Sequence, residues 1–89
     1  MIDDGEYYIK KNPEPWNKRA NLLYIESPAG VGFSYAATPK DMIHNDMSQS
    51  IDAFNALQDW YRLFPEFLDN DLYISGESYG GIYVPYLSW

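Results

Sequence analysis

The sequence predicts an α/β fold with a parallel sheet, and three features of the chain support this prediction. Residues 21–26 form a nearly continuous apolar run that ends before Pro28, as expected for a buried parallel strand. Residues 45–64 carry apolar side chains at helical spacing, and residues 72–75 are strand-like again. Strand, helix and strand at this spacing form a βαβ crossover, which makes the sheet parallel.

The helix predicted at residues 45–64 has recognisable ends. Asn45 or Asp46 can cap its start, and Pro65 ends it. Its predicted core-facing stripe consists of Met47, Ile51, Phe54, Tyr61 and Phe64, widened by Ala53, Leu57 and Trp60.

The remaining segments suggest an incomplete domain. Residues 6–10 are a short strand candidate, residues 11–17 form a proline-containing loop, and residues 28–39 form a long loop. The apolar run at residues 82–87 can start a helix, but the chain stops there without a C-cap signal. We therefore expect residues 1–89 to be part of a larger domain, truncated at both ends.

Composition excludes several classes of function. The 89 residues carry a net charge of −7, and their 6 Lys and Arg are scattered, which argues against a nucleic-acid surface. No apolar run approaches the roughly 20 residues of a membrane span. The chain has no Cys, so it is silent on redox compartment, and its acidic start does not resemble a signal peptide.

The most informative motif is Gly76-Glu77-Ser78-Tyr79-Gly80, which fits the nucleophile-elbow pattern G-x-S-x-G. Its context is a strand before and a helix after, which is the context this motif requires. A sharp turn of this kind places the Ser in a strained backbone, and we expect a side chain at either flanking Gly to clash. The Tyr79 N–H then points to where an oxyanion would form.

Two competing motifs fail on context. Ser34 lies in a second near-elbow, but Thr38 and Pro39 follow where a helix should start. Gly30 and Gly32 could open a dinucleotide fingerprint, but a third Gly and a following helix are missing.

The sequence does not contain a complete catalytic triad. A Ser nucleophile needs a base, usually His, oriented by a carboxylate, and after this type of elbow both follow the Ser. His44 is the only His and precedes Ser78, so we interpret it as a solvated loop residue near the helix start. We expect Pro85 to kink the last helix.

Three stretches together resemble the serine carboxypeptidases of the α/β-hydrolase fold. Residues 16–35 read W-N-x-x-A-N-L-L-Y-I-E-S-P-A-G-V-G-F-S-Y, residues 64–67 read F-P-E-F, and residues 76–87 read G-E-S-Y-G-G-x-Y-V-P-x-L. The helix text at residues 54–66 is similar to the lysosomal branch of that family. The resemblance implies a fragment of an α/β-hydrolase fold: a βαβ unit, the nucleophile elbow and the start of the following helix.

The resemblance also implies roles for three residues. Ser78 matches the nucleophile, and Tyr79 matches the residue whose backbone N–H forms half of the oxyanion hole. Glu77 matches one of two carboxyl groups that share a proton and bind the C-terminal carboxylate of the substrate. Alternatively, the helix dipole keeps Glu77 ionised, or Glu77 is an incidental polar residue of the turn.

Other parts of the family's machinery are missing from this chain. The W-N-G-G-P-G-C-S-S stretch, the partner Glu, and the catalytic Asp and His lie elsewhere in the family. Gly80 stands where Ala is usual, and residues 26–28 are expected to shape the floor of the active site.

The sequence therefore predicts a serine carboxypeptidase fragment that carries the nucleophile. The parent enzyme is expected to release C-terminal residues from peptides or proteins through an acyl-enzyme at acidic pH. The resemblance implies no metal or organic cofactor, and a lysosomal, vacuolar or secreted location. Two alternatives remain: an inactive truncated product that acts as a binding piece, or an acyltransferase or esterase on the same scaffold.

Overall fold

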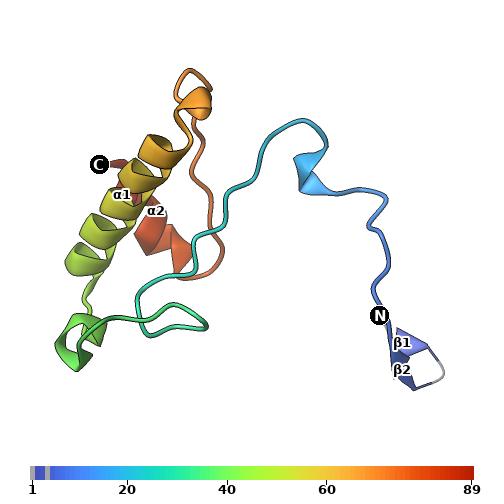
Figure 1. The fold of residues 1–89 in the computed structure, drawn as a ribbon, viewed down its shortest axis with the longest axis horizontal. Coiled ribbons are helices and arrows are strands. Elements are labelled where there is room, and N and C mark those ends of the chain that lie inside the picture. Colours follow the sequence, from blue (N-terminus) through green and yellow to red (C-terminus); the bar gives the residue numbers. More distant parts are fainter. Residues whose placement is uncertain (1, 4) are drawn as a thin grey trace.

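The computed structural model describes residues 2–3 and 5–89 of the chain. In these residues two α-helices lie at one end of the molecule and a small hairpin lies at the other, joined by irregular chain (Figure 1). The regular elements are β1 (Ile2–Asp3), β2 (Glu6–Tyr7), η1 (Trp16–Lys18), η2 (Pro39–Met42), α1 (Asp46–Leu63), η3 (Pro65–Phe67) and α2 (Gly80–Ser88).

Helix α1 begins and ends where the sequence predicts. The Asn45 side chain accepts a hydrogen bond from the Ser48 backbone N–H at 2.8 Å, and the Ser48 hydroxyl accepts one from the Asn45 N–H at 2.9 Å. This reciprocal capping box satisfies two backbone donors that a helix start otherwise leaves unpaired. Pro65 follows the C-cap residue Phe64 and prevents the helix from continuing.

The predicted apolar stripe of α1 is buried only in part. Met47, Ile51 and Phe54 are about half exposed, at 52%, 53% and 49%. The buried residues of α1 are Ala53, which belongs to the stripe, and the polar Gln49 and Ser50. Leu57, Trp60 and Tyr61 of the stripe are half-buried. The prediction is therefore confirmed at Ala53 and wrong for Met47, Ile51 and Phe54, because the buried face of α1 is centred on Gln49, Ser50 and Ala53.

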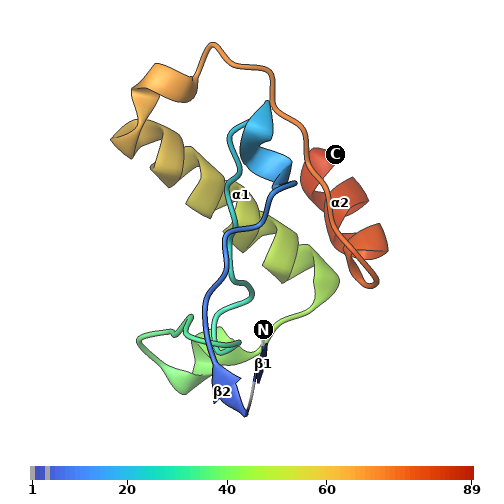
Figure 2. The ribbon, with the colours of Figure 1, turned by 90° about the vertical axis from the view of Figure 1, so that its right-hand side faces the viewer.

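Helix α2 packs beside α1, and the two views agree on this arrangement (Figures 1 and 2). Ser50 and Ala53 of α1 and Gly80 of α2 are all buried. Helix α2 runs on through Pro85 to Ser88. At the other end of α1, aromatic rings gather around Trp60, with Phe64 and Phe67 at centroid distances of 5.2 and 5.3 Å. This contact anchors η3 against α1.

The strand candidate at residues 6–10 is present only in part. Its first two residues form β2, which pairs antiparallel with β1 in the register Ile2↔Tyr7 and Asp3↔Glu6. Gly5 adopts the positive φ of 81° that the connecting turn requires.

The two strands predicted for the parallel sheet are not strands in this structure. Residues 21–26 and 72–75 are irregular connections, and no backbone hydrogen bond joins them within the described residues. The predicted burial is also wrong, since Leu22, Leu23 and Ile25 are 42–45% exposed. A strand exists only through its ladder with a neighbour, and neither segment pairs with one here.

The described chain is expanded for its size. Its radius of gyration is 16.3 Å, against about 12 Å for a compact domain of this length. Its accessible surface is 8203 Å², against about 5400 Å² for a compact monomer of this mass. Within residues 2–3 and 5–89, neither α-helix has the length and apolar character needed to cross a membrane.

Candidate active site

The turn at residues 76–80 has the strained backbone that the motif predicts. Ser78 is the only described residue other than Gly with a positive φ, at 58°. This left-handed conformation costs a residue with a side chain about 1–3 kcal/mol and persists only where the surroundings impose it. Two turn hydrogen bonds impose it locally: Gly80 N–H donates to Glu77 at 2.9 Å and Gly81 N–H donates to Ser78 at 3.0 Å.

The turn leaves two groups available at its apex. The Tyr79 backbone N–H makes no hydrogen bond with any described residue, although the N–H groups of the next four residues all do. The Ser78 hydroxyl also has no hydrogen-bond partner in the described chain. A free hydroxyl beside a free N–H is an arrangement that can form an ester and stabilise an oxyanion next to it.

The two flanking glycines differ in what surrounds them. A Cβ on Gly76 would lie 3.0 Å from the Gly80 Cα and 3.2 Å from the Val84 Cγ2. A Cβ on Gly80 would meet no described atom within 4 Å. The predicted clash is therefore present at Gly76, where the chain approaches α2, and absent at Gly80.

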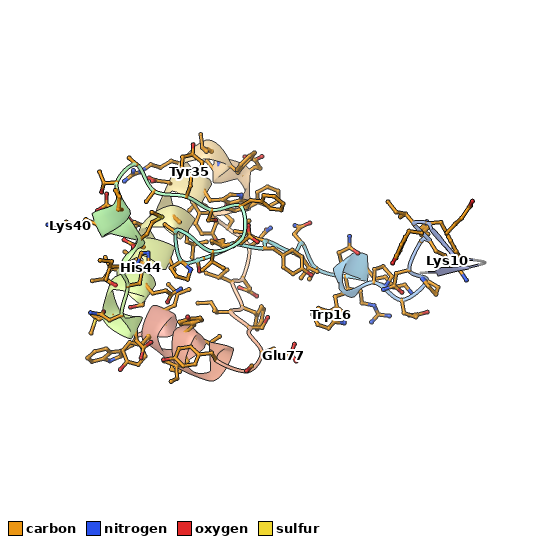
Figure 3. All side chains as sticks on the ribbon, turned by 90° about the horizontal axis from the view of Figure 1, so that it is seen from below. Lys10, Trp16, Tyr35, Lys40, His44 and Glu77 are labelled. Atoms are coloured by element: carbon orange, nitrogen blue, oxygen red, sulfur yellow. The ribbon has the colours of Figure 1, made fainter. Side chains whose placement is uncertain are left out.

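Glu77 stands at the tip of the turn. Its side chain is exposed, and Figure 3 shows it directed away from the two helices. The predicted parallel sheet would bring Glu26 beside it, because the carboxyl ends of parallel strands meet at one edge of a sheet. No hydrogen bond joins Glu26 to Glu77 or Ser78 in the described residues, because the Glu26 carboxylate accepts one from the Phe33 N–H at 2.7 Å instead.

Glu26 therefore organises its own loop. Its backbone carbonyl accepts a hydrogen bond from the Ser34 hydroxyl, so Ser34 is engaged in holding the loop. Gly32 has a positive φ of 56°, and a Cβ there would lie 1.9 Å from a Glu26 carboxylate oxygen. The loop that the sequence predicts at residues 28–39 thus folds around a carboxylate, with η2 forming only at its end.

His44 is not the solvated loop residue that its place in the sequence predicts. Its side chain is only 10% exposed. Its Nε2 donates to the Ala29 carbonyl oxygen at 3.2 Å, and its Nδ1 lies 3.6 Å from the Asp52 carboxylate. The ring fills the space between the loop and α1, well away from Glu77 (Figure 3). Its role here is to attach the loop to the helix.

Two further side-chain contacts link the elbow and the loop to α1, and no sequence motif predicts either of them. The Tyr79 hydroxyl donates to the Asp46 carboxylate at 2.8 Å. This hydrogen bond, followed by burial and the Asp46 charge, raises the pKa of Tyr79 above its ordinary value of about 10. The Gln49 Nε2 donates to the Ser27 hydroxyl at 3.1 Å, while the buried Gln49 Oε1 has no partner in the described residues.

An open hollow of about 1930 Å³ lies beside the elbow. It is lined by residues 21–25, residues 72–80, and the facing sides of α1 and α2. Its volume exceeds the roughly 300–1,000 Å³ of a small-molecule site, and it is bordered by the two predicted strands. Among residues 2–3 and 5–89, no group of three or more His, Asp or Glu side chains could hold a metal ion.

Comparison with known proteins matches the whole length of the chain to one protein family. The profile of the family described as serine carboxypeptidase matches residues 1–89. The chain is 52% identical over 88 residues to the lysosomal protective protein of Mus musculus, a match that covers 99% of this chain and 18% of that protein. It is 53% identical over 81 residues to serine carboxypeptidase-like 26 of Oryza sativa subsp. japonica, covering 90% of this chain and 17% of that protein.

A third relative is serine carboxypeptidase 1 of Hordeum vulgare, with 47% identity over 77 residues, 86% of this chain and 15% of that protein. The chain thus spans less than a fifth of the length of these relatives.

Proposed function

The chain belongs to the serine carboxypeptidase family, and we propose that it carries the nucleophile of a serine carboxypeptidase. This family implies an α/β-hydrolase fold. The parent protein releases C-terminal residues from peptides through an acyl-enzyme. The positive φ of Ser78 inside G-E-S-Y-G carries the proposal, because a strained backbone at a Ser is the mark of a nucleophile elbow.

Ser78 and Tyr79 have complementary roles in this reaction. The Ser78 Oγ attacks the scissile carbonyl carbon and forms an ester as the peptide C–N bond breaks. The leaving amino acid takes the peptide nitrogen together with the proton lost by Oγ, and water then hydrolyses the ester and restores the hydroxyl. The oxygen of the carbonyl becomes negative as the bond forms, and the Tyr79 N–H donates to it. The absence of any competing acceptor for this N–H among the described residues supports that role.

Glu77 contributes to substrate binding. Its exposed position at the tip of the turn supports contact with a substrate, and in the family the matching Glu shares a proton with a second carboxyl. A substrate carboxylate beside ionised carboxyls suffers like-charge repulsion, so binding favours acidic pH. Work at acidic pH suits a lysosome, a vacuole or a secreted enzyme, and the name of the mouse relative points the same way.

Residues 21–26 and 72–75 are strands of a larger sheet in the parent domain. They border the hollow beside the elbow, and that hollow has room for further secondary structure. Their apolar side chains are exposed here, as expected for strands that lack their neighbours. On this proposal, residues 1–89 are one part of a carboxypeptidase domain, and alone they hydrolyse nothing.

The nucleophile is tested by covalent labelling of the full-length protein with an organophosphonate probe. We expect one labelled site, at Ser78, and no labelling after Ser78→Ala. The matched control is Ser34→Ala, because Ser34 lies in the competing motif and its hydroxyl is bound to the Glu26 carbonyl. Labelling that survives Ser78→Ala, or that Ser34→Ala removes, contradicts the assignment.

The role of Glu77 is tested by Glu77→Gln in the full-length protein. We expect a shifted pH profile of kcat/KM for a peptide with a free C-terminal carboxylate, and a smaller change for the same peptide amidated at its C-terminus. Glu66→Gln is the matched control, since Glu66 is exposed in η3 at the far end of α1. An unshifted profile in Glu77→Gln removes the basis for a binding role.

A further inference from the structure

A side-chain hydrogen bond joins the elbow to the start of α1. The Tyr79 hydroxyl donates to Asp46 Oδ1 at 2.8 Å, across 33 positions of sequence. Among the described residues this bond is the one side-chain hydrogen bond between the turn at residues 76–80 and any other element. It therefore connects the residue that follows Ser78 to a separate helix.

The acceptor is held rigidly. Asp46 is the first residue of α1, directly after the N-cap Asn45, and the capping box with Ser48 fixes the backbone on both sides of it. A carboxylate at this position is also stabilised by the positive end of the helix dipole. Asp46 is thus a fixed anchor, and α1 is the longest regular element in the described chain.

The donor is also constrained. The Tyr79 ring packs edge-on against the Tyr83 ring, one turn further along α2, with centroids 4.9 Å apart. Ring packing fixes the plane of Tyr79, and the hydroxyl bond fixes its far end. With both fixed, the Tyr79 backbone has little freedom to rotate its N–H.

We propose that Asp46 is a positioning residue for the acyl-transfer reaction. It acts through the Tyr79 side chain to hold the strained Ser78 backbone and the Tyr79 N–H in their reactive orientation. This inference rests on the proposed function of Ser78 and adds a residue that the motif does not contain. The physical need is clear, because a left-handed Ser relaxes unless its surroundings over-determine it.

The effect belongs to the chemical step. Asp46 does not touch the substrate, and a small misplacement of the reacting groups lowers rates strongly while leaving binding intact. Tyr79→Phe deletes only the hydroxyl and retains the ring packing on Tyr83. In the full-length protein we expect this variant to lower kcat about tenfold with KM unchanged.

A double-mutant cycle provides the sharpest test. Tyr79→Phe, Asp46→Ala and the double variant are compared in their rates of organophosphonate labelling at Ser78. Each single variant is expected to slow labelling about tenfold, and the double variant is expected to be no slower than either single one, because both remove one interaction. Asp46→Asn keeps an oxygen acceptor and is expected to recover most of the rate.

Asp59→Ala is the matched control, since it removes a carboxylate from the other end of α1, where Asp59 pairs with Arg62. It is expected to label at the wild-type rate. Additive effects of the two substitutions, a raised KM with unchanged kcat, or wild-type rates in both single variants overturn the positioning role while leaving the nucleophile in place. Absence of labelling at Ser78 in the wild-type protein overturns the proposed function itself.

Discussion

Gly76 and Gly80 flank the same turn, and they should respond to the same substitution in opposite directions. The Cβ of Gly76→Ala lies 3.0 Å from the Gly80 Cα and 3.2 Å from the Val84 Cγ2. One of these neighbours is backbone, so α2 must move by a few tenths of an ångström away from the turn. Overpacking of this kind costs about 1–3 kcal/mol.

Gly80→Ala meets no described atom within 4 Å, and the residue begins α2 with no positive φ. Alanine there restricts the unfolded chain and favours the helix, a gain of up to about 1 kcal/mol. The two variants are therefore expected to differ by about 1–4 kcal/mol in free energy of unfolding, with Gly76→Ala the less stable. Alanine at position 80 is also the usual residue of the family pattern that this chain resembles.

The assay is urea unfolding of the two full-length variants, combined with the rate of organophosphonate labelling at Ser78. Gly76→Ala is expected to slow labelling about 10–100-fold, because the shift of α2 moves the turn that holds Ser78. Gly80→Ala is expected to leave labelling unchanged. Equal stabilities for the two variants, or slow labelling in Gly80→Ala alone, refute the reasoning from close contact.

Three further predictions concern the loop at residues 28–39, the Tyr79–Asp46 hydrogen bond and the chain as a whole. Gly32 has a positive φ, and the Cβ of Gly32→Ala would lie 1.9 Å from a Glu26 oxygen. This substitution should therefore lower the free energy of unfolding of the full-length protein by more than about 1 kcal/mol. An unchanged free energy in urea unfolding counts against the loop geometry. The hydrogen bond to Asp46 raises the pKa of Tyr79. The stabilisation that this bond provides is therefore complete below pH of about 10 and is lost as pH rises through the raised pKa. The prediction is contradicted if, in an alkaline titration of tyrosinate absorbance, Tyr79→Phe does not remove a late-titrating group. Residues 1–89 alone bury only about 45% of their unfolded surface, against about 60% for a small stable domain. We therefore expect this chain alone to show no cooperative urea transition and no peptide hydrolysis at acid pH. A cooperative transition together with turnover that depends on Ser78 disproves this expectation.

The features predicted correctly from sequence are those with local causes. The limits of α1 follow from Asn45 and Pro65, each of which acts within one helical turn. The positive φ of Ser78 follows from the five consecutive residues of the motif, although the strand predicted before them is not formed. In each case the residues that determine the geometry are neighbours in the chain.

The features that sequence reasoning missed depend on contacts between distant segments. The Tyr79–Asp46 bond spans 33 positions, and no periodicity or motif places those two side chains together. The burial of His44 between Ala29 and α1 depends on how the loop folds back. The exposure of Met47, Ile51 and Phe54 could not be predicted for a related reason. The sequence pattern states which face of α1 is apolar, but not what lies against that face.

The contrast between helices and predicted strands has one physical origin. A helix satisfies its backbone hydrogen bonds within itself, so α1 and α2 form with the partners available in 89 residues. A strand satisfies its backbone only through neighbours, so residues 21–26 and 72–75 cannot form a ladder without them. The turn at residues 76–80 resembles the helices in this respect, because its hydrogen bonds, from Gly80 to Glu77 and from Gly81 to Ser78, join residues close in sequence. The left-handed backbone of Ser78 is therefore present although residues 21–26 and 72–75 form no ladder, because the hydrogen bonds that hold this turn lie within residues 77–81.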